Sequence, residues 1–130
     1  MTDIKKLTKI SLIVVAILPF IFGVLLVFLF DMTFNYEGWA NPLHVRVLGG
    51  VMFVVSLFAI IMLRKKEWEE IKLTYLFLYS LFIPAILIEL VVVIVYGSTF
   101  LPQTITQIIL DQVLMWIMLV LGIVSYIKQR

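Results

Sequence analysis

Four long apolar blocks, three of them without any charged residue, constrain this chain more than any other feature of its sequence. Residues 10–30, 47–63 and 112–127 contain no Asp, Glu, Lys or Arg, and residues 73–96 contain only Glu89. A helix of about 20 apolar residues crosses the roughly 30 Å hydrocarbon core of a bilayer. The blocks lack the apolar–polar alternation of membrane β-strands. They predict an all-α integral membrane protein with four transmembrane helices, which cover about residues 10–30, 43–63, 73–96 and 105–127.

The distribution of basic residues predicts how these helices are oriented. All but one of the ten lysines and arginines lie before the first helix, between the second and third, or after the fourth; the exception is Arg46. Basic residues accumulate on the cytoplasmic side of a membrane protein. We therefore expect a multi-pass protein of the cell membrane, a four-helix up-down bundle in a single domain over residues 1–130, with both termini in the cytoplasm.

Several classes of function are excluded or disfavoured by what the sequence lacks. It has no cysteine, which excludes disulfide bonds, thiolate metal sites and CxxC redox chemistry. The net charge of +2 is too small and too localised to indicate nucleic-acid binding. The motifs G-x-S-x-G, Walker A and H-E-x-x-H are absent from the sequence, so we expect a protein without enzymatic activity. No ligand spacing indicates a metal site, and one histidine cannot supply both axial imidazoles of a haem.

Three charged residues are expected inside the membrane at similar depth. With about 1.5 Å of rise per residue, Glu89 lies about 10 Å below the outer end of the third helix and Asp111 about 9 Å below that of the fourth. Arg46 lies about 6 Å inside the second helix, which we expect to begin at Pro42. Charged side chains in the hydrocarbon usually face the bundle interior or pair with each other. We therefore expect Arg46 to face both acids.

Polar neighbours extend this set of residues. Thr104, Gln107 and Asp111 follow one another at i, i+3 and i+7, a stripe on one side of the fourth helix. His44 and Asp31 are expected at the rim of the membrane. In one interpretation the set is a buried ion network that fixes the helix register. In the other it lines a small outward-facing pocket for a polar head group, a quinone or a proton, because a buried carboxyl can carry protons.

Glycine and proline predict local features of the helices. Small residues let transmembrane helices approach closely, and we expect this packing role for Gly23, Gly49, Gly50 and Gly122. Pro19 and Pro84 lie within the first and third predicted helices, where proline removes a backbone hydrogen bond and predicts a kink.

The second span, "HVRVLGGVMFVVSLFAIIMLRKK", resembles the second span of small four-helix DoxX-like membrane proteins. The matching features are Arg46, the pair Gly49 and Gly50 three residues later, and the basic residues 64–66 after an apolar helix. The chain length and the four-span layout are also similar. The resemblance implies a membrane accessory protein or a quinone-linked subunit, and it supplies no catalytic residues.

Two functions are consistent with these observations. The absence of a catalytic constellation favours a non-catalytic accessory subunit or assembly factor of a larger membrane complex, with a membrane protein or a second copy of the chain as partner. The alternative is an autonomous binder or carrier of a lipid-like molecule, a quinone or a proton, in an outer-leaflet pocket around Arg46, Glu89 and Asp111. Neither function requires a cofactor other than quinone or lipid.

Overall fold

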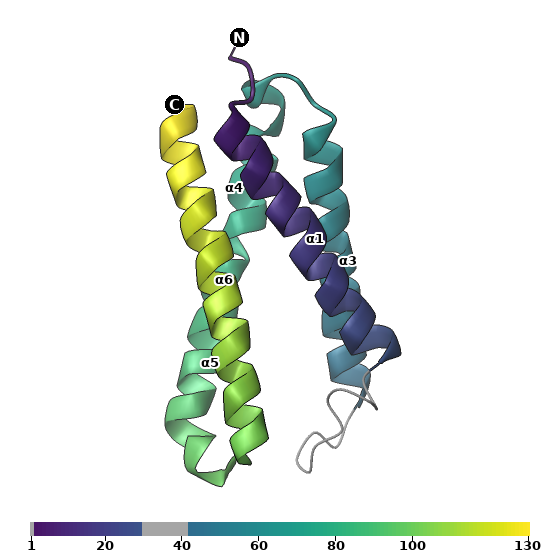
Figure 1. Cartoon of the computed structure of the whole chain (residues 1–130), viewed down its shortest axis with the longest axis vertical. Coiled ribbons are helices and arrows are strands. Elements are labelled where there is room, and N and C mark those ends of the chain that lie inside the picture. The colour runs from purple at the N-terminus through teal and green to yellow at the C-terminus, as the bar shows by residue number, and fades with distance from the viewer. Residues whose placement is uncertain (1, 30–41) are drawn as a thin grey trace.

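The computed structural model describes residues 2–29 and 42–130, and the regular elements of these residues are helices (Figure 1). They are α1 (Lys6–Phe28), α3 (Pro42–Leu63), α4 (Trp68–Ser80), α5 (Phe82–Tyr96), the short 3₁₀ helix η1 (Gly97–Thr99) and α6 (Pro102–Gln129). Four helical segments are long and apolar enough to cross a membrane: Lys6–Phe28, Leu43–Leu63, Trp68–Thr99 and Pro102–Gln129. The prediction of an all-α chain with four such helices is confirmed for the described residues.

The helices extend beyond the uncharged blocks from which they were predicted. α1 begins at Lys6 rather than near residue 10, and α6 ends at Gln129 rather than 127. Lysine side chains at a helix end can keep their charge in water while the backbone remains helical. α3 begins at Pro42, as predicted, whereas Asn41 and Asp31 lie outside the described residues.

Pro84 coincides with an interruption of the third span. α4 ends at Ser80 and α5 begins at Phe82, because a proline at position 84 has no N–H to donate to the carbonyl of residue 80. At the same place, the Ser80 hydroxyl donates to the carbonyl of Phe77 (2.7 Å). In contrast, α1 continues as one helix through Pro19.

Both termini and the turn between α3 and α4 meet at one end of the molecule, which we call the termini end (Figure 1). The N–H of Ile4 donates to the carbonyl of Lys66 (3.1 Å), and the N–H of Trp68 donates to the carbonyl of Thr2 (2.8 Å). These bonds hold the segment before α1 against the turn between α3 and α4.

Gln129 joins the end of α6 to the same segment. Its Oε1 accepts hydrogen bonds from the N–H of Lys5 and the hydroxyl of Thr8, both at 2.8 Å. Its Nε2 donates to the carbonyl of Asp3 (2.8 Å). The Gln129 side chain is almost fully buried. These three bonds satisfy most of the hydrogen-bonding capacity of its amide, which would otherwise be costly to bury.

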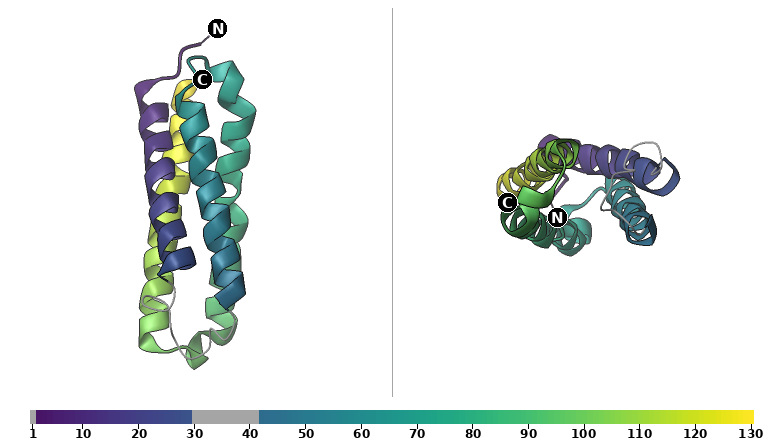
Figure 2. Two further views of the ribbon diagram at one scale, coloured as in Figure 1. Left: turned by 90° about the vertical axis from the view of Figure 1, so that its right-hand side faces the viewer. Right: turned by 90° about the horizontal axis from the view of Figure 1, so that it is seen from below.

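The main hydrophobic core occupies the half of the molecule next to the termini end. All of the long helices contribute to it, with residues such as Leu12, Ala59, Tyr75, Phe82 and Met118. Towards the opposite end, the second core cluster contains only residues of α1 and α3, namely Leu26 and Val45 with Leu25 against them. α1 and α3 therefore pack with α4 and α6 near the termini, and the α1–α3 pair diverges from the α5–α6 pair away from them, as Figures 1 and 2 show.

Three of the four glycines predicted to mediate packing do so. A Cβ atom at Gly23 would lie 2.8 Å from the ring of Phe53, and one at Gly49 would lie 2.9 Å from Leu26 Cβ, so these glycines allow α1 and α3 to approach closely. Gly122 lies directly against the ring of Tyr79. The expectation for Gly50 is not met among the described residues, because a Cβ atom there would meet none of their atoms within 4 Å.

Candidate functional site

A cavity of about 340 Å³ lies between the two diverging helix pairs. Its lining residues come from α1 and α3 on one side and from α5 and α6 on the other, and they extend from the middle of the molecule to Phe100 beyond η1. The cavity exists because the helix pairs are joined by a shared core only in the half near the termini. Its position is therefore a direct consequence of how the four helices pack.

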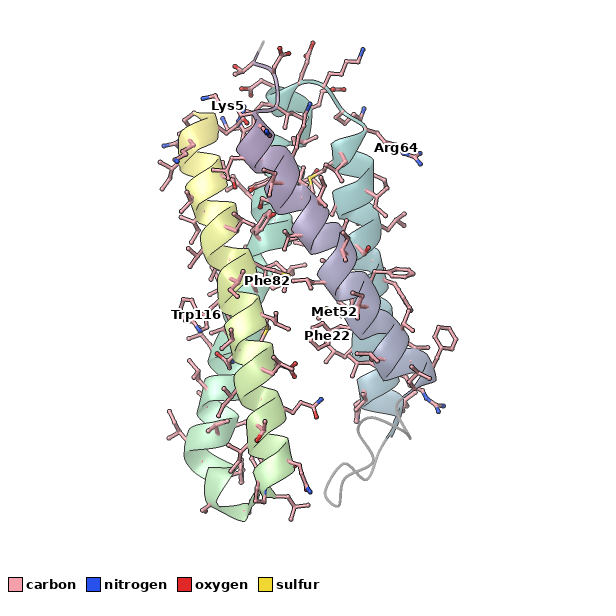
Figure 3. The ribbon with its side chains drawn as sticks, viewed as in Figure 1. Lys5, Phe22, Met52, Arg64, Phe82 and Trp116 are labelled. Atoms are coloured by element: carbon pink, nitrogen blue, oxygen red, sulfur yellow. The ribbon has the colours of Figure 1, made fainter. Side chains whose placement is uncertain are left out.

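The wall formed by α1 and α3 is apolar. It includes Phe22 and Leu26 from α1, and Leu48 and Met52 from α3. Figure 3 shows Phe22 and Met52 directed towards the space between the helix pairs, with Phe82 on the other side of that space. This wall can contact hydrocarbon, and it offers no charge or hydrogen-bond donor to a polar group.

The polar side chains of the cavity all come from the α5–α6 side. They are Glu89 on α5 and Thr104, Gln107 and Asp111 on α6. The stripe recognised in the sequence at i, i+3 and i+7 of α6 thus lies along one side of the cavity. Glu89 and Asp111 line the same cavity from α5 and α6.

Gln112 connects the two helices that carry the acidic residues of the cavity. Its Nε2 donates to Glu89 Oε2 (2.9 Å) and to the carbonyl of Ile86 (3.2 Å), which links α6 to α5. Asp111 Oδ1 is buried and has no hydrogen-bond partner, and the same is true of Gln112 Oε1. Most buried polar atoms are hydrogen-bonded, so Asp111 retains an unused acceptor beside the cavity.

Arg46 and His44 do not line the cavity, and both are exposed. The expectation that Arg46 faces Glu89 and Asp111 is therefore not met in this structure. Within residues 2–29 and 42–130, the ion pair that the structure contains joins Lys65 Nζ to Glu70 Oε1 (3.1 Å).

The orientation of α3 explains why Arg46 lies elsewhere. The sequence interpretation assumed that Arg46 points to the bundle interior. Gly49, three residues from Arg46 and so about 60° away around the helix axis, faces α1, where a Cβ atom would contact Val27 and Leu26. Leu48, which does line the cavity, is two residues from Arg46 and so is turned by about 200° around the helix axis. Arg46 is consequently on the side of α3 away from the acids.

Gln112 is the residue of this site that sequence reasoning missed. It follows Asp111 directly and is a polar residue in an otherwise apolar stretch. That position was a usable signal, because a buried amide in a membrane helix needs a partner on a neighbouring helix. Nothing in the sequence identified Glu89 as that partner.

The described residues contain no group of three or more His, Asp or Glu side chains that could hold a metal ion. The polar atoms of the cavity are carboxyl, amide and hydroxyl groups, and its other lining side chains are apolar. Such an arrangement can bind a molecule that is apolar along most of its length and polar at one end.

No family model, curated protein or solved structure matches this chain. The resemblance of the second span to DoxX-like proteins therefore has no support from a family model.

Proposed function

We propose that this chain is a multi-pass protein of the cell membrane, an up-down bundle with both termini in the cytoplasm. The contacts of Thr2, Lys66 and Gln129 at the termini end support this arrangement. All lysines and arginines except Arg46 lie before or in the first turn of α1, between α3 and the second turn of α4, or at the end of α6. By the positive-inside rule, the cavity then opens in the outer half of the membrane.

We further propose that the protein binds a small amphiphilic molecule in this cavity. The observation that carries the proposal is the division of the cavity into an apolar side, from α1 and α3, and a side with four polar residues, from α5 and α6. The volume of about 340 Å³ is in the range of small-molecule sites, roughly 300–1,000 Å³. An occupant that places its tail against Phe22 and Met52 and its head near Asp111 would match both sides.

The proposed ligand also accounts for polar groups that are hard to explain by packing alone. Asp111 Oδ1 is buried without a partner, a state that costs free energy in a folded protein. An ion network through Arg46, the structural interpretation of these acids, would have removed that cost, but Arg46 lies on the other side of α3. A ligand head group with a hydrogen-bond donor would satisfy Asp111 in the bound state.

The role of an accessory subunit or assembly factor remains a prediction from the sequence. It requires a protein partner, and the amphiphile proposal requires a retained small molecule. One measurement distinguishes the two functions: native mass spectrometry of the protein extracted in mild detergent from the membrane in which it is made. We expect a single chain that carries a small molecule.

Two variants of α3 make this measurement specific to the cavity. Met52→Trp should fill the cavity and abolish retention of the small molecule. Leu57→Trp is the matched control, because Leu57 is 54% exposed and does not line the cavity. A stoichiometric protein partner without a small molecule, or equal retention by Met52→Trp and the wild type, would reject the amphiphile proposal.

A further inference from the structure

The charges around the cavity indicate what kind of head group it accepts. This inference rests on the proposed function and specifies its ligand. We propose that the occupant is a single-chain amphiphile with a cationic, hydrogen-bond-donating head, such as an alkylammonium, held by Asp111 and Glu89.

Hydrogen bonding gives the first argument. The amide N–H groups of Gln112 already serve Glu89 and the carbonyl of Ile86, so this side chain donates nothing to Asp111. Asp111 Oδ1 therefore needs a donor that the described protein residues do not supply. An ammonium group carries three donors and no acceptor, which suits a site whose nearest unsatisfied groups are acceptors.

Charge balance gives the second argument. Two carboxyl groups share one side of the cavity, and no Lys, Arg or His lines it. Arg46 and His44 are on α3 but outside the cavity, and residues 30–41 contain no basic residue at all. Carboxylates in a membrane need an opposite charge or a proton. A cationic head group supplies the charge, and a charged hydrogen bond is stronger than a neutral one.

The shape of the cavity gives the third argument. The acids lie on α5 and α6, and the opposing wall of Phe22, Leu48 and Met52 is apolar. A head group at Asp111 would therefore leave an alkyl tail to lie against that wall, where apolar contact is favourable. A small inorganic cation would leave the apolar wall without a contact. The acids and the apolar wall together therefore favour an organic cation.

The test compares three probes with the same chain length and different head charge. Isotope-labelled decylammonium, decanol and decanoate are each titrated against the protein in lipid nanodiscs, with empty nanodiscs as the partition control. We expect saturable binding of decylammonium, with an affinity about tenfold or more above that of decanol, because a charge-assisted hydrogen bond is roughly twice as strong as the neutral one that decanol can donate. Decanoate should bind most weakly. Equal affinity for decylammonium and decanol, or stronger binding of decanoate, would overturn the inference.

Variants then assign the effect to the acids. Asp111→Asn and Glu89→Gln each keep the side-chain shape, and each should weaken decylammonium binding about tenfold while decanol binding changes little. Glu69→Gln removes the same charge from an exposed position on α4 and should change nothing. If neither acid variant selectively weakens the cation, the proposed head group is wrong.

A cavity-filling variant distinguishes an error in the proposed head group from an error in the proposed binding site. Met52→Trp should weaken binding of both decylammonium and decanol, because it removes space rather than charge. If Met52→Trp binds all probes as the wild type does, the cavity is not the binding site and the proposed function itself fails. If Met52→Trp weakens every probe but Asp111→Asn does not discriminate between them, only the assignment of a cationic head group fails.

Discussion

The ring of Tyr79 on α4 lies against Gly122 on α6, in the space that a Cβ atom at position 122 would occupy. The hydroxyl of Tyr79 is hydrogen-bonded to Ser11 on α1, and the hydroxyl of Tyr75 donates to the carbonyl of Gly122 (3.1 Å). Three helices therefore meet at this contact in the main core. It holds the bundle together on the side of the cavity nearer the termini.

Gly122→Ala is expected to destabilise the protein by about 1–3 kcal/mol, because the added methyl group displaces the Tyr79 ring from a packed core. Gly50→Ala is the matched control, since a Cβ atom at position 50 meets nothing within 4 Å. It should be neutral or slightly stabilising, by up to about 1 kcal/mol, because alanine favours a helix. The free energy of unfolding of each variant is measured in mixed micelles. Equal effects of Gly122→Ala and Gly50→Ala would contradict the packing of Tyr79 against Gly122.

Gln129→Leu is expected to loosen the termini end. The change leaves the N–H of Lys5, the hydroxyl of Thr8 and the carbonyl of Asp3 without their partner, at about 1–3 kcal/mol for each group that stays buried. Hydrogen exchange of residues 2–8 should accelerate, while exchange in α5 should not change. Gln103→Leu, on an exposed position of α6, is the control. Unchanged exchange in Gln129→Leu would show that these bonds do not hold the N-terminal segment.

Arg46→Ala and Glu89→Gln are expected to act independently. Arg46 is on the side of α3 away from the cavity, so the double mutant should show the sum of the two single changes in unfolding free energy, within about 0.5 kcal/mol. An ion pair between these residues would instead give a coupling energy well above that limit, and the double mutant would recover stability. The double-mutant cycle therefore distinguishes the observed arrangement from the ion network expected from the sequence.

The orientation in the membrane can be measured with single cysteines, because the chain has none of its own. Lys6→Cys and Lys66→Cys place a thiol on exposed positions at the termini end, and Ser98→Cys places one on the exposed η1. A membrane-impermeant maleimide added to intact cells should label only Ser98→Cys. Labelling of Lys6→Cys or Lys66→Cys before the cells are opened would reverse the proposed topology.

The sequence by itself determined the helices. Charge-free blocks of sufficient length have to form helices in a membrane, because a backbone in hydrocarbon must satisfy its own hydrogen bonds. Pro84, which lacks an N–H, predicted a kink in the third span, and the structure has an interruption between α4 and α5 there. The position of Glu89 along its helix also followed from the sequence, because α5 ends at Tyr96 as assumed. α6 begins at Pro102 rather than near residue 105, so Asp111 lies about 14 Å from its start instead of about 9 Å.

Only the tertiary structure decided which side chains meet. α3 is apolar around most of its circumference, so its sequence contains little information about its rotation, and the side on which Arg46 lies could not be read from it. The bond from Gln112 to Glu89 likewise depends on how α6 is rotated against α5. The cavity depends on a core that joins all four spans near the termini and only α1 with α3 at the other end. Depth is a property of one helix, whereas rotation and separation are properties of pairs of helices.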